Sequence, residues 1–293
     1  MYRDNPMMYI GVLFEALLFQ GSTLGWDIAG TRESVRSMTR ARMAAFRKHF
    51  YHADRMVFGL AGNIDTKVLP VIEERFGRLA RRSYGKKFAR FATHQRAPRI
   101  LLHTRETEQV HLALGFPSYP RGDRRLPTLR ILDSILGGNM SSRLFIAIRE
   151  RKGLAYYVHS SIDTFEDTGS FAVGSGLTAS KIEQAIKIIV KELHNIREHG
   201  VTEKELEKAK HFMRGKMTLA LEETDAVVDW YAKQALFGHE VKTPEEKMKE
   251  LFAVTNADIK RVACEIFNFS KVNLAMIGPF KGEEERFKKL LRI

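Results

Sequence analysis

The stretch LRILDSILGGNMSSRLFIAIRERKGLAYYVHSSIDTFEDTGSFAVG, residues 129–174, decides the fold class of this chain. Its first part places apolar residues at helical spacing as far as Leu136, and Gly137-Gly138-Asn139 then ends the predicted helix. Ser141-Ser142 is a favourable cap for a second helix, which stops at Gly153 because glycine readily adopts the left-handed conformation that ends many helices. The stretch therefore predicts two consecutive helices.

Two apolar segments after these helices predict a β-hairpin. Residues 155–162 and 169–176 have strand composition, and the turn Glu166-Asp167-Thr168-Gly169 joins them. Upstream, residues 110–116 alternate apolar side chains with His111 on the other face, which predicts another strand. Strands come in hairpin-like groups and helices in runs, so the predicted fold class is α+β with an antiparallel or mixed sheet. The remaining predicted helices lie near residues 182–196, 203–223, 225–237 and 255–267.

The composition is that of an ordinary globular protein. The 293 residues are 44% apolar and 28% charged, which excludes a disordered or collagen-like chain. No stretch approaches the roughly 20 apolar residues of a membrane helix, and the N-terminus lacks the apolar core of a signal peptide. We therefore expect no membrane span and a cytoplasmic location. The single Cys264 excludes a disulfide framework, and its place between Val262 and Ile266 on an amphipathic helix predicts a buried thiol.

The net charge of +13 comes mostly from one segment. Ten of the 48 Lys and Arg residues lie within residues 75–105, which contain no Asp or Glu, and the rest of the chain carries only +3. Residues 81–98 lack a sustained apolar period, which predicts a basic interdomain linker. Such a linker is either simply solvated or in contact with an acidic partner. No aromatic-interleaved or groove-reading motif accompanies the cations, so we expect no nucleic-acid binding.

An internal repeat divides the chain. Residues 35–65 align without gaps on residues 251–281 at a constant offset of 216, and the apolar pattern recurs. Each copy predicts a Thr-capped amphipathic helix, a short apolar strand (residues 56–62 and 272–278) and a Gly-containing turn into another helix. The pattern indicates a duplicated domain.

The repeat also predicts where the domains begin and end. If the second copy starts after the linker, about 120 residues of the first copy have no counterpart in this chain. We therefore expect residues 1–80 to be the second half of a first domain and residues 99–293 to be a complete second domain. Without that front, sheet edges and part of the core of the first domain would be uncovered. We therefore expect either association with another chain, as a homodimer or a heteromer, or partial disorder of residues 1–80.

The histidines give no metal site by their spacing. The pairs His49/His52, His194/His199 and His103/His111 are three, five and eight residues apart. None forms the i, i+4 pair with an adjacent Glu that places two imidazoles and a general base on one helical face. We therefore expect no metal ligand and no catalytic residue in this chain, and its sequence contains no P-loop, G-x-S-x-G or dinucleotide fingerprint.

Arg149 and Tyr156 are the candidate site residues. Arg149 lies in the last turn of a predicted helix and Tyr156 opens the strand beyond Gly153, so the chain reversal can bring both side chains to one edge. An Arg donates a rigid fork of hydrogen bonds, and a Tyr hydroxyl can support a developing oxyanion. The plainer alternative is that Arg149 only complements the helix dipole, a role for which Arg151 and Lys152 are equally placed.

Two segments resemble a known family. Residues 109–123, QVHLALGFPSYPRGD, and residues 129–174 are similar to the C-terminal domain of the insulinase/pitrilysin family of zinc peptidases, in its processing-peptidase branch. Residues 4–39, DNPMMYIGVLFEALLFQGSTLGWDIAGTRESVRSMT, resemble the second half of that family's N-terminal domain. The resemblance implies tandem homologous α/β-sandwich domains that enclose a chamber, with the first domain truncated here.

The resemblance also implies a division of roles. The family's H-x-x-E-H zinc motif and its third ligand, a Glu, belong to the first half of the N-terminal domain, so Zn²⁺ is expected in the full-length or a complementing protein and no cofactor in this chain. The substrate-binding Arg/Tyr pair of the C-terminal domain falls on Arg149 and Tyr156.

Two functions follow from the sequence. The first is a fragment or subunit of a zinc metalloendopeptidase that contributes the substrate-binding half of a peptide-hydrolysing site and is inactive alone. The second is a non-catalytic partner or core subunit of a heteromeric peptidase. In both, the expected ligand is a peptide or an unfolded protein segment.

Overall fold

The structure is a computed structural model that describes residues 2–79, 88–238 and 240–291. It divides into two compact units: unit 1 comprises residues 1–27, 89–213 and 250–293, and unit 2 comprises residues 28–88 and 214–249. This division does not follow the predicted boundaries, because the first 27 residues pack with the later part of the chain. The assignment of residues 1–80 to a preceding domain stays a prediction, and residues 81–87 of the predicted linker lie outside the described residues.

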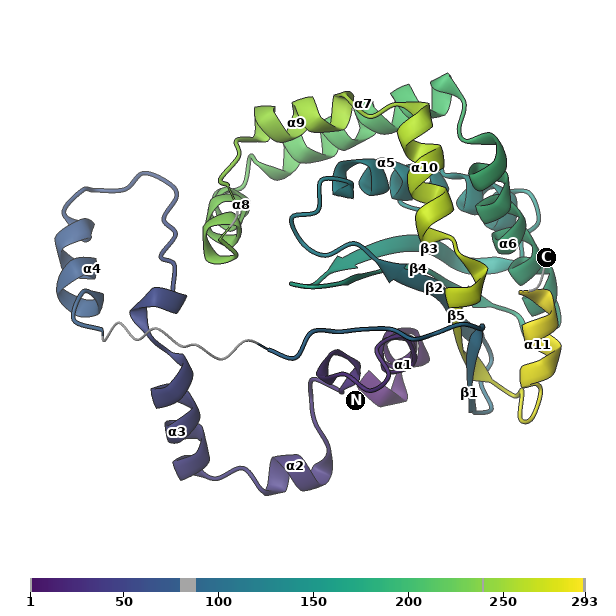
Figure 1. The fold of residues 1–293 in the computed structure, drawn as a ribbon, viewed down its shortest axis with the longest axis horizontal. Helices are drawn as coiled ribbons and strands as arrows, with labels where there is room; N and C mark the ends of the chain where they lie inside the picture. Colours follow the sequence, from purple (N-terminus) through teal and green to yellow (C-terminus); the bar gives the residue numbers. More distant parts are fainter. Residues whose placement is uncertain (1, 80–87, 239, 292–293) are drawn as a thin grey trace. The chain divides into compact units, whose positions relative to one another are not determined.

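Unit 1 is built on one mixed sheet, as the α+β prediction requires (Figure 1). The strand order is β1-β5-β2-β4-β3; β1 and β5 are parallel, and the other neighbouring pairs are antiparallel. The predicted hairpin is formed by β3 and β4, with β3 at the edge of the sheet. The strands are β1 Arg99–Thr104, β2 Val110–Ser118, β3 Ala155–Thr164, β4 Gly169–Leu177 and β5 Asn273–Gly278.

One face of this sheet carries the main core. The alternate residues Val110, Leu112, Leu114 and Phe116 of β2 are fully buried, which confirms the predicted strand and its apolar face. Helices α5 (Leu126–Leu136), α6 (Ile182–His199) and α10 (Asn256–Ile266) cover this face (Figure 1). Each helix turns a stripe of Leu, Ile and Val inwards, as an amphipathic helix does on a sheet.

Helix α1 (Pro6–Leu18) covers the opposite face (Figure 1). Asn5 caps it by accepting a hydrogen bond from the N–H of Met7, and Pro6 opens its first turn. Ile10, Phe14 and Leu18, spaced four apart, are buried against Ala113 of β2 and Ala275 and Ile277 of β5. The small alanine side chains allow the helix to approach the sheet closely.

The remaining helices of the two units are short or amphipathic. Unit 1 contains the π-helix η4 (Phe145–Glu150), the first part of α7 (Glu203–Ala220), the end of α9 (Pro244–Phe252) and α11 (Glu284–Leu290). Unit 2 contains α2 (Arg32–Arg36), α3 (Arg40–Phe50), α4 (Val68–Phe76) and α8 (Thr224–Leu236). Single 3₁₀ turns lie at Tyr2–Asp4, Thr23–Gly25, Ala53–Arg55, Ala179–Lys181 and Phe269–Lys271. Among the described helices, none combines the length and apolar character needed to cross a bilayer.

The repeat is visible in the helices. Thr39 caps α3 and Thr255 caps α10, each by accepting a hydrogen bond from the N–H three residues on. Helices α3 and α10 begin 216 residues apart, and so do α4 and α11. Helices α3 and α10 also have the same length of 11 residues. The shared cap and length of this pair and the common spacing of both pairs support a duplicated domain.

The strand predicted at residues 56–62 is absent from the described residues, and this prediction was wrong. Its counterpart β5 forms the middle of the sheet in unit 1, whereas Val57, Phe58 and Leu60 lie in extended but unpaired chain against α8 in unit 2. A strand requires a neighbouring strand for its backbone hydrogen bonds, and every strand in the described residues belongs to unit 1.

Cys264 also differs from its prediction. It lies on α10, but its side chain is exposed, while Val262, Ala263 and Ile266 face the core. Its thiol donates a weak hydrogen bond to the carbonyl oxygen of Arg197, 3.5 Å away. The apolar stripe of the helix is therefore filled by the residues beside the cysteine.

Candidate functional site

Arg149 and Tyr156 lie on two elements that pack against each other, η4 and the start of β3. Both side chains are exposed, and Tyr156 exposes 58% of its surface. The Arg149 guanidinium lies 5.2 Å from the ring centroid of Phe145, one turn back on η4, so an aromatic face supports it from below. Both predicted site residues thus present their polar groups to solvent from fixed backbone.

The turn between them is held by backbone hydrogen bonds. The N–H of Gly153 donates to the carbonyl oxygen of Arg149 at 3.1 Å, and the N–H of Leu154 donates to that of Ile148 at 2.9 Å. Gly153 has φ +56°, the left-handed conformation predicted for the end of this helix. Leu154 is buried and anchors the start of the strand. Arg149 and Tyr156 are therefore joined by a short, well-defined reversal.

A β-bulge places Tyr156. On β3, Ala155 pairs with Leu177 and Tyr157 pairs with Gly176, so Tyr156 is an extra residue opposite no partner. In an unbroken register Tyr156 would stand opposite Leu177, whose side chain is buried in the core. Because Ala155 takes that position, the Tyr156 ring is left outside the core. Bulges of this kind commonly redirect a side chain next to a functional site.

A hydrogen bond between His111 and Tyr157 adjoins the bulge and was missed by the sequence analysis. The His111 Nδ1 and Tyr157 Oη atoms are 2.9 Å apart, although 46 residues separate them in the chain. Burial raises the pKa of Tyr157 to about 12, and burial lowers the pKa of the His111 imidazole. Both groups are therefore neutral near pH 7. The sequence feature that pointed to this contact was His111, a polar residue on the strand face opposite the apolar side chains of residues 110–116.

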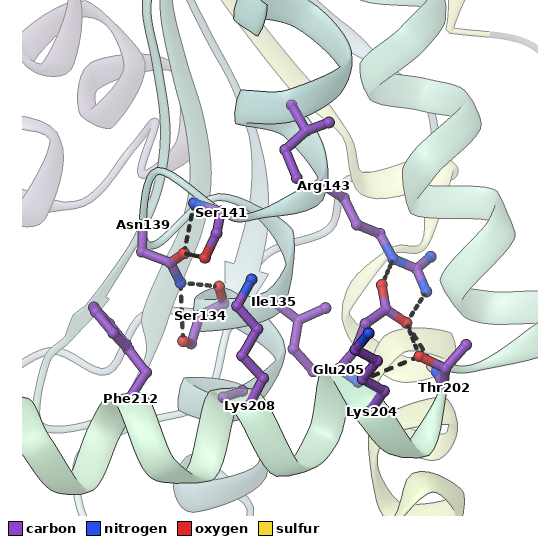
Figure 2. Close-up of a pocket in the computed structure, with 12 residues that line it drawn as sticks. Ser134, Ile135, Asn139, Ser141, Arg143, Thr202, Lys204, Glu205, Lys208 and Phe212 are labelled. Atoms are coloured by element: carbon purple, nitrogen blue, oxygen red, sulfur yellow. Dashed lines mark hydrogen bonds and ion pairs between the residues drawn. The ribbon is translucent and has the colours of Figure 1, made fainter. Parts of the chain in front are cut away.

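A cavity of about 240 Å³ lies between the end of α5 and the first turns of α7 (Figure 2). In its wall, Arg143 donates to Glu205 through Nε at 2.6 Å and Nη2 at 2.8 Å, and the N–H of Thr202 also donates to Glu205 at 2.8 Å. Burial alone would raise the pKa of Glu205, but these hydrogen bonds outweigh it and lower the pKa to about 2. Asn139 orders the loop before η4 by accepting from the N–H of Ser141. These contacts tie α7 to the start of the helix that bears Arg149.

Two of the histidines that were considered as metal ligands make packing or backbone contacts instead. His52 is buried with Nε2 3.0 Å from the carbonyl oxygen of His49, and the His194 ring stacks on Phe269 with centroids 4.4 Å apart. Across the described ranges of the chain, no group of three or more His, Cys, Asp or Glu side chains is arranged to hold a metal ion.

Comparison with known proteins identifies the family. The family model described as "Peptidase M16 inactive domain" matches residues 37–213, more than half of the chain. The chain belongs to the M16 peptidase family. It is 34% identical over 281 residues to the "uncharacterized zinc protease YmxG" of Bacillus subtilis, covering 95% of this chain and 67% of that protein. It is 33% identical over 291 residues to an "uncharacterized zinc protease" of Streptomyces coelicolor, covering 97% of this chain and 63% of that one.

The solved structures agree with the M16 fold. An M16 inactive-domain structure from Pseudomonas fluorescens superposes with a TM-score of 0.85 at 22% identity, over 95% of this chain and 66% of the other. The fold is therefore insulinase-like, and the chain spans about two thirds of the length of the M16 relatives it matches.

Proposed function

We propose that this chain supplies the substrate-binding half of a composite peptide-hydrolysing site and is inactive alone. The bulge at Tyr156 carries the proposal, because it extrudes an aromatic hydroxyl that a regular strand would turn into the core, directly after the turn that bears Arg149. The exposed ring gains little from packing, and bulges next to binding sites commonly redirect a side chain in this way.

Arg149 and Tyr156 would hold the peptide. The Arg149 guanidinium offers several N–H donors in one plane to a peptide carbonyl oxygen, and the Tyr156 hydroxyl adds a further donor that can strengthen as negative charge develops on that oxygen. Fixed donors of this kind act by positioning the substrate before the reaction rather than by exchanging protons.

We propose that zinc binds outside this part of the protein. The relatives are named zinc proteases, but the described residues of this chain offer no cluster of side chains that could bind the metal ion. We therefore assign zinc binding to the complementing segment or chain, and we derive no step of the reaction from it.

Unit 2 supports association with such a segment or chain. Its stretch of residues 57–60 and its helices α3 and α4 leave apolar side chains in solvent, and Phe58 exposes 48% of its surface. Exposed apolar residues in such numbers mark a surface that another chain covers. These exposed residues include Val35, Met38, Met43, Phe46, Tyr51, Met56, Val57, Phe58, Leu60, Leu69 and Val71. The covering partner is a second copy, or a homologue bearing the H-x-x-E-H motif. A cytoplasmic location is part of the same proposal.

A non-catalytic core subunit is the second candidate. The match to a domain described as inactive is compatible with it, as it is with the first candidate. In that case the same peptide-binding residues would feed a substrate to an active homologue, and the chain would stimulate that homologue without restoring activity to any inactive partner.

The test is reconstitution of peptide hydrolysis. The purified chain with added zinc is assayed on a fluorogenic unstructured peptide, alone and after addition of a motif-bearing segment taken from a longer relative. We expect no hydrolysis alone and hydrolysis after complementation. In the complemented enzyme, Arg149→Ala and Tyr156→Phe should each lower the rate by roughly 10- to 100-fold, the cost of losing one oriented donor.

Arg151→Ala is the matched control, because Arg151 is exposed one residue beyond the same helix. It should leave the rate within about twofold of the wild-type value, since surface substitutions away from a site have small effects. Equal losses of rate in the Arg149 and Arg151 variants would show that both residues act only through their surface charge, and this result would refute the proposed role of Arg149.

A further inference from the structure

Three residues form a straight row across the sheet beside the bulge. Tyr157 of β3 pairs with Gly176 of β4, and Gly176 pairs in turn with His111 of β2. The side chains of Tyr157 and His111 lie on the face of the sheet opposite the buried Leu177 and Val173. The Tyr157 ring spans the middle strand, and its hydroxyl reaches the His111 Nδ1 atom at 2.9 Å.

The ring can take this path only because residue 176 is glycine. A Cβ atom at Gly176 would lie 2.4 Å from Cε1 of Tyr157, far inside van der Waals contact, so any other residue would lift the ring from the sheet. The two ring planes of His111 and Tyr157 lie 33° apart with centroids 5.9 Å from each other, so they also pack on one another.

The backbone of Tyr157 is held as firmly as its ring. The buried Ser175 hydroxyl donates to the carbonyl oxygen of Tyr157 at 2.8 Å. Tyr157 is the first residue in register after the bulge, so its position fixes where the extra residue must leave the strand.

We infer that Tyr157, held by His111 across Gly176, is a positioning residue that sets the bulge and thereby aims Tyr156 at the substrate. This inference rests on the proposed role of Tyr156 in peptide binding, and it adds a group that touches no substrate itself.

The neighbouring row provides a matched control. His159 of β3 pairs with Gly174 of β4, and a Cβ atom at Gly174 would lie 2.8 Å from Cε1 of His159. The His159 side chain is exposed, so its ring can swing into solvent. Gly174→Ala therefore adds the same methyl group, two residues away on the same strand and face, where it meets the His159 ring and not the Tyr157 ring. The His159 and Tyr157 ring centroids lie 5.7 Å apart, so the control also measures how far a shift of His159 alone affects Tyr157.

The first experiment reads the geometry without any substrate. The intact chain is nitrated with tetranitromethane, and peptide mass spectrometry distinguishes modification of Tyr156 from that of Tyr157. In the wild type and in Gly174→Ala, Tyr156 should react and Tyr157 should be protected. In Gly176→Ala the displaced Tyr157 should react several times more than in the wild type. Continued protection of Tyr157 in Gly176→Ala, or equal exposure in Gly174→Ala, would overturn the inference.

The second experiment reads the function in the complemented enzyme. Gly176→Ala and Tyr157→Phe should lower peptide hydrolysis, by up to roughly 100-fold, because small displacements of a positioning group are costly. In a Tyr156→Phe background the same changes should add little, since they act through Tyr156. A full additional loss in that background would show a merely structural role and would refute the inference.

Tyr157→Phe removes only the hydroxyl and keeps the ring, so it tests the hydrogen bond to His111 even if Gly176→Ala fails to fold. If Arg149→Ala and Tyr156→Phe leave hydrolysis unchanged, the proposed function fails, whereas the nitration pattern still decides whether Gly176 allows the Tyr157 ring to be held across the sheet.

Discussion

Glu205→Gln should destabilise unit 1 in a strongly pH-dependent manner. In the wild type, both carboxylate oxygens of Glu205 accept hydrogen bonds from Arg143, and the N–H and hydroxyl of Thr202 donate to the same carboxylate. The side chains of Arg143 and Glu205 are only 20% and 29% exposed, so water competes weakly with these bonds. Thr202 and Glu205 also form a capping box at the start of α7, so the loss of charge weakens the helix N-terminus as well.

The pKa of Glu205 determines how much stability is lost and how the loss changes with pH. The pKa of Glu205 falls from 4.5 to about 2 in the folded protein, which corresponds to at most roughly 3 kcal/mol of stability. A depressed carboxyl pKa contributes its full stability above the unfolded pKa and loses it as pH falls through the folded one. We therefore expect a deficit of about 2 to 3 kcal/mol in Glu205→Gln at pH 7, shrinking to about half or less by pH 3.

The assay is guanidinium unfolding followed by far-UV circular dichroism at several pH values. Glu203→Gln is the control, because Glu203 lies exposed in the same helical turn, and it should cost less than about 0.5 kcal/mol. An equal free energy of unfolding for Glu205→Gln and wild type at pH 7, or a deficit that stays constant down to pH 3, would refute this reasoning.

Two further predictions concern the frame of the site. Phe14→Ala should lower the free energy of unfolding by about 3 to 5 kcal/mol, because it opens a cavity where α1 covers the sheet. Denaturant unfolding measures this loss, and a loss below about 1 kcal/mol would show that α1 does not pack there. Gly153→Ala should lower the free energy of unfolding by about 1 to 2 kcal/mol, since φ of +56° is unfavourable for a residue with a side chain. Gly215 lies in open space inside α7, and Gly215→Ala should raise the free energy of unfolding by about 0.5 to 1 kcal/mol. Thermal melts compare the two variants, and equal shifts in Tm would contradict the assigned backbone conformations.

Local signals predicted most of the elements. The caps Thr39 and Thr255, the turn at Gly153 and the alternation in residues 110–116 each depend on neighbours within a few residues, and each was confirmed. These interactions form wherever the chain carries the right residues, so the sequence alone is sufficient to place them.

The errors concern partners far away in the chain. Residues 56–62 have the composition of a strand, but a strand forms only beside another strand, and the described part of unit 2 offers none. Cys264 was predicted to be buried from its apolar neighbours, yet the α10 stripe is completed by Ala263.

The geometry around the candidate residues was predicted in part for the same reason. The reversal that joins Arg149 to Tyr156 depends on their short separation in the chain, but the bulge that extrudes Tyr156 and the His111–Tyr157 hydrogen bond arise from the pairing of three strands. The role of Arg149 and Tyr156 in substrate binding stays a prediction. The sequence shows Gly176 and His111 separately, and only the register brings them into one row.

Peptide binding by the isolated chain tests the central claim most directly. A fluorescently labelled, unstructured peptide is titrated with the purified chain, and anisotropy gives the dissociation constant without any need for zinc or a catalytic partner. The account predicts saturable binding that Arg149→Ala and Tyr156→Phe each weaken by about 10-fold, a loss of roughly 1.4 kcal/mol, while Arg151→Ala binds as the wild type does. Binding of equal strength in all four proteins would contradict the claim that this chain holds the substrate.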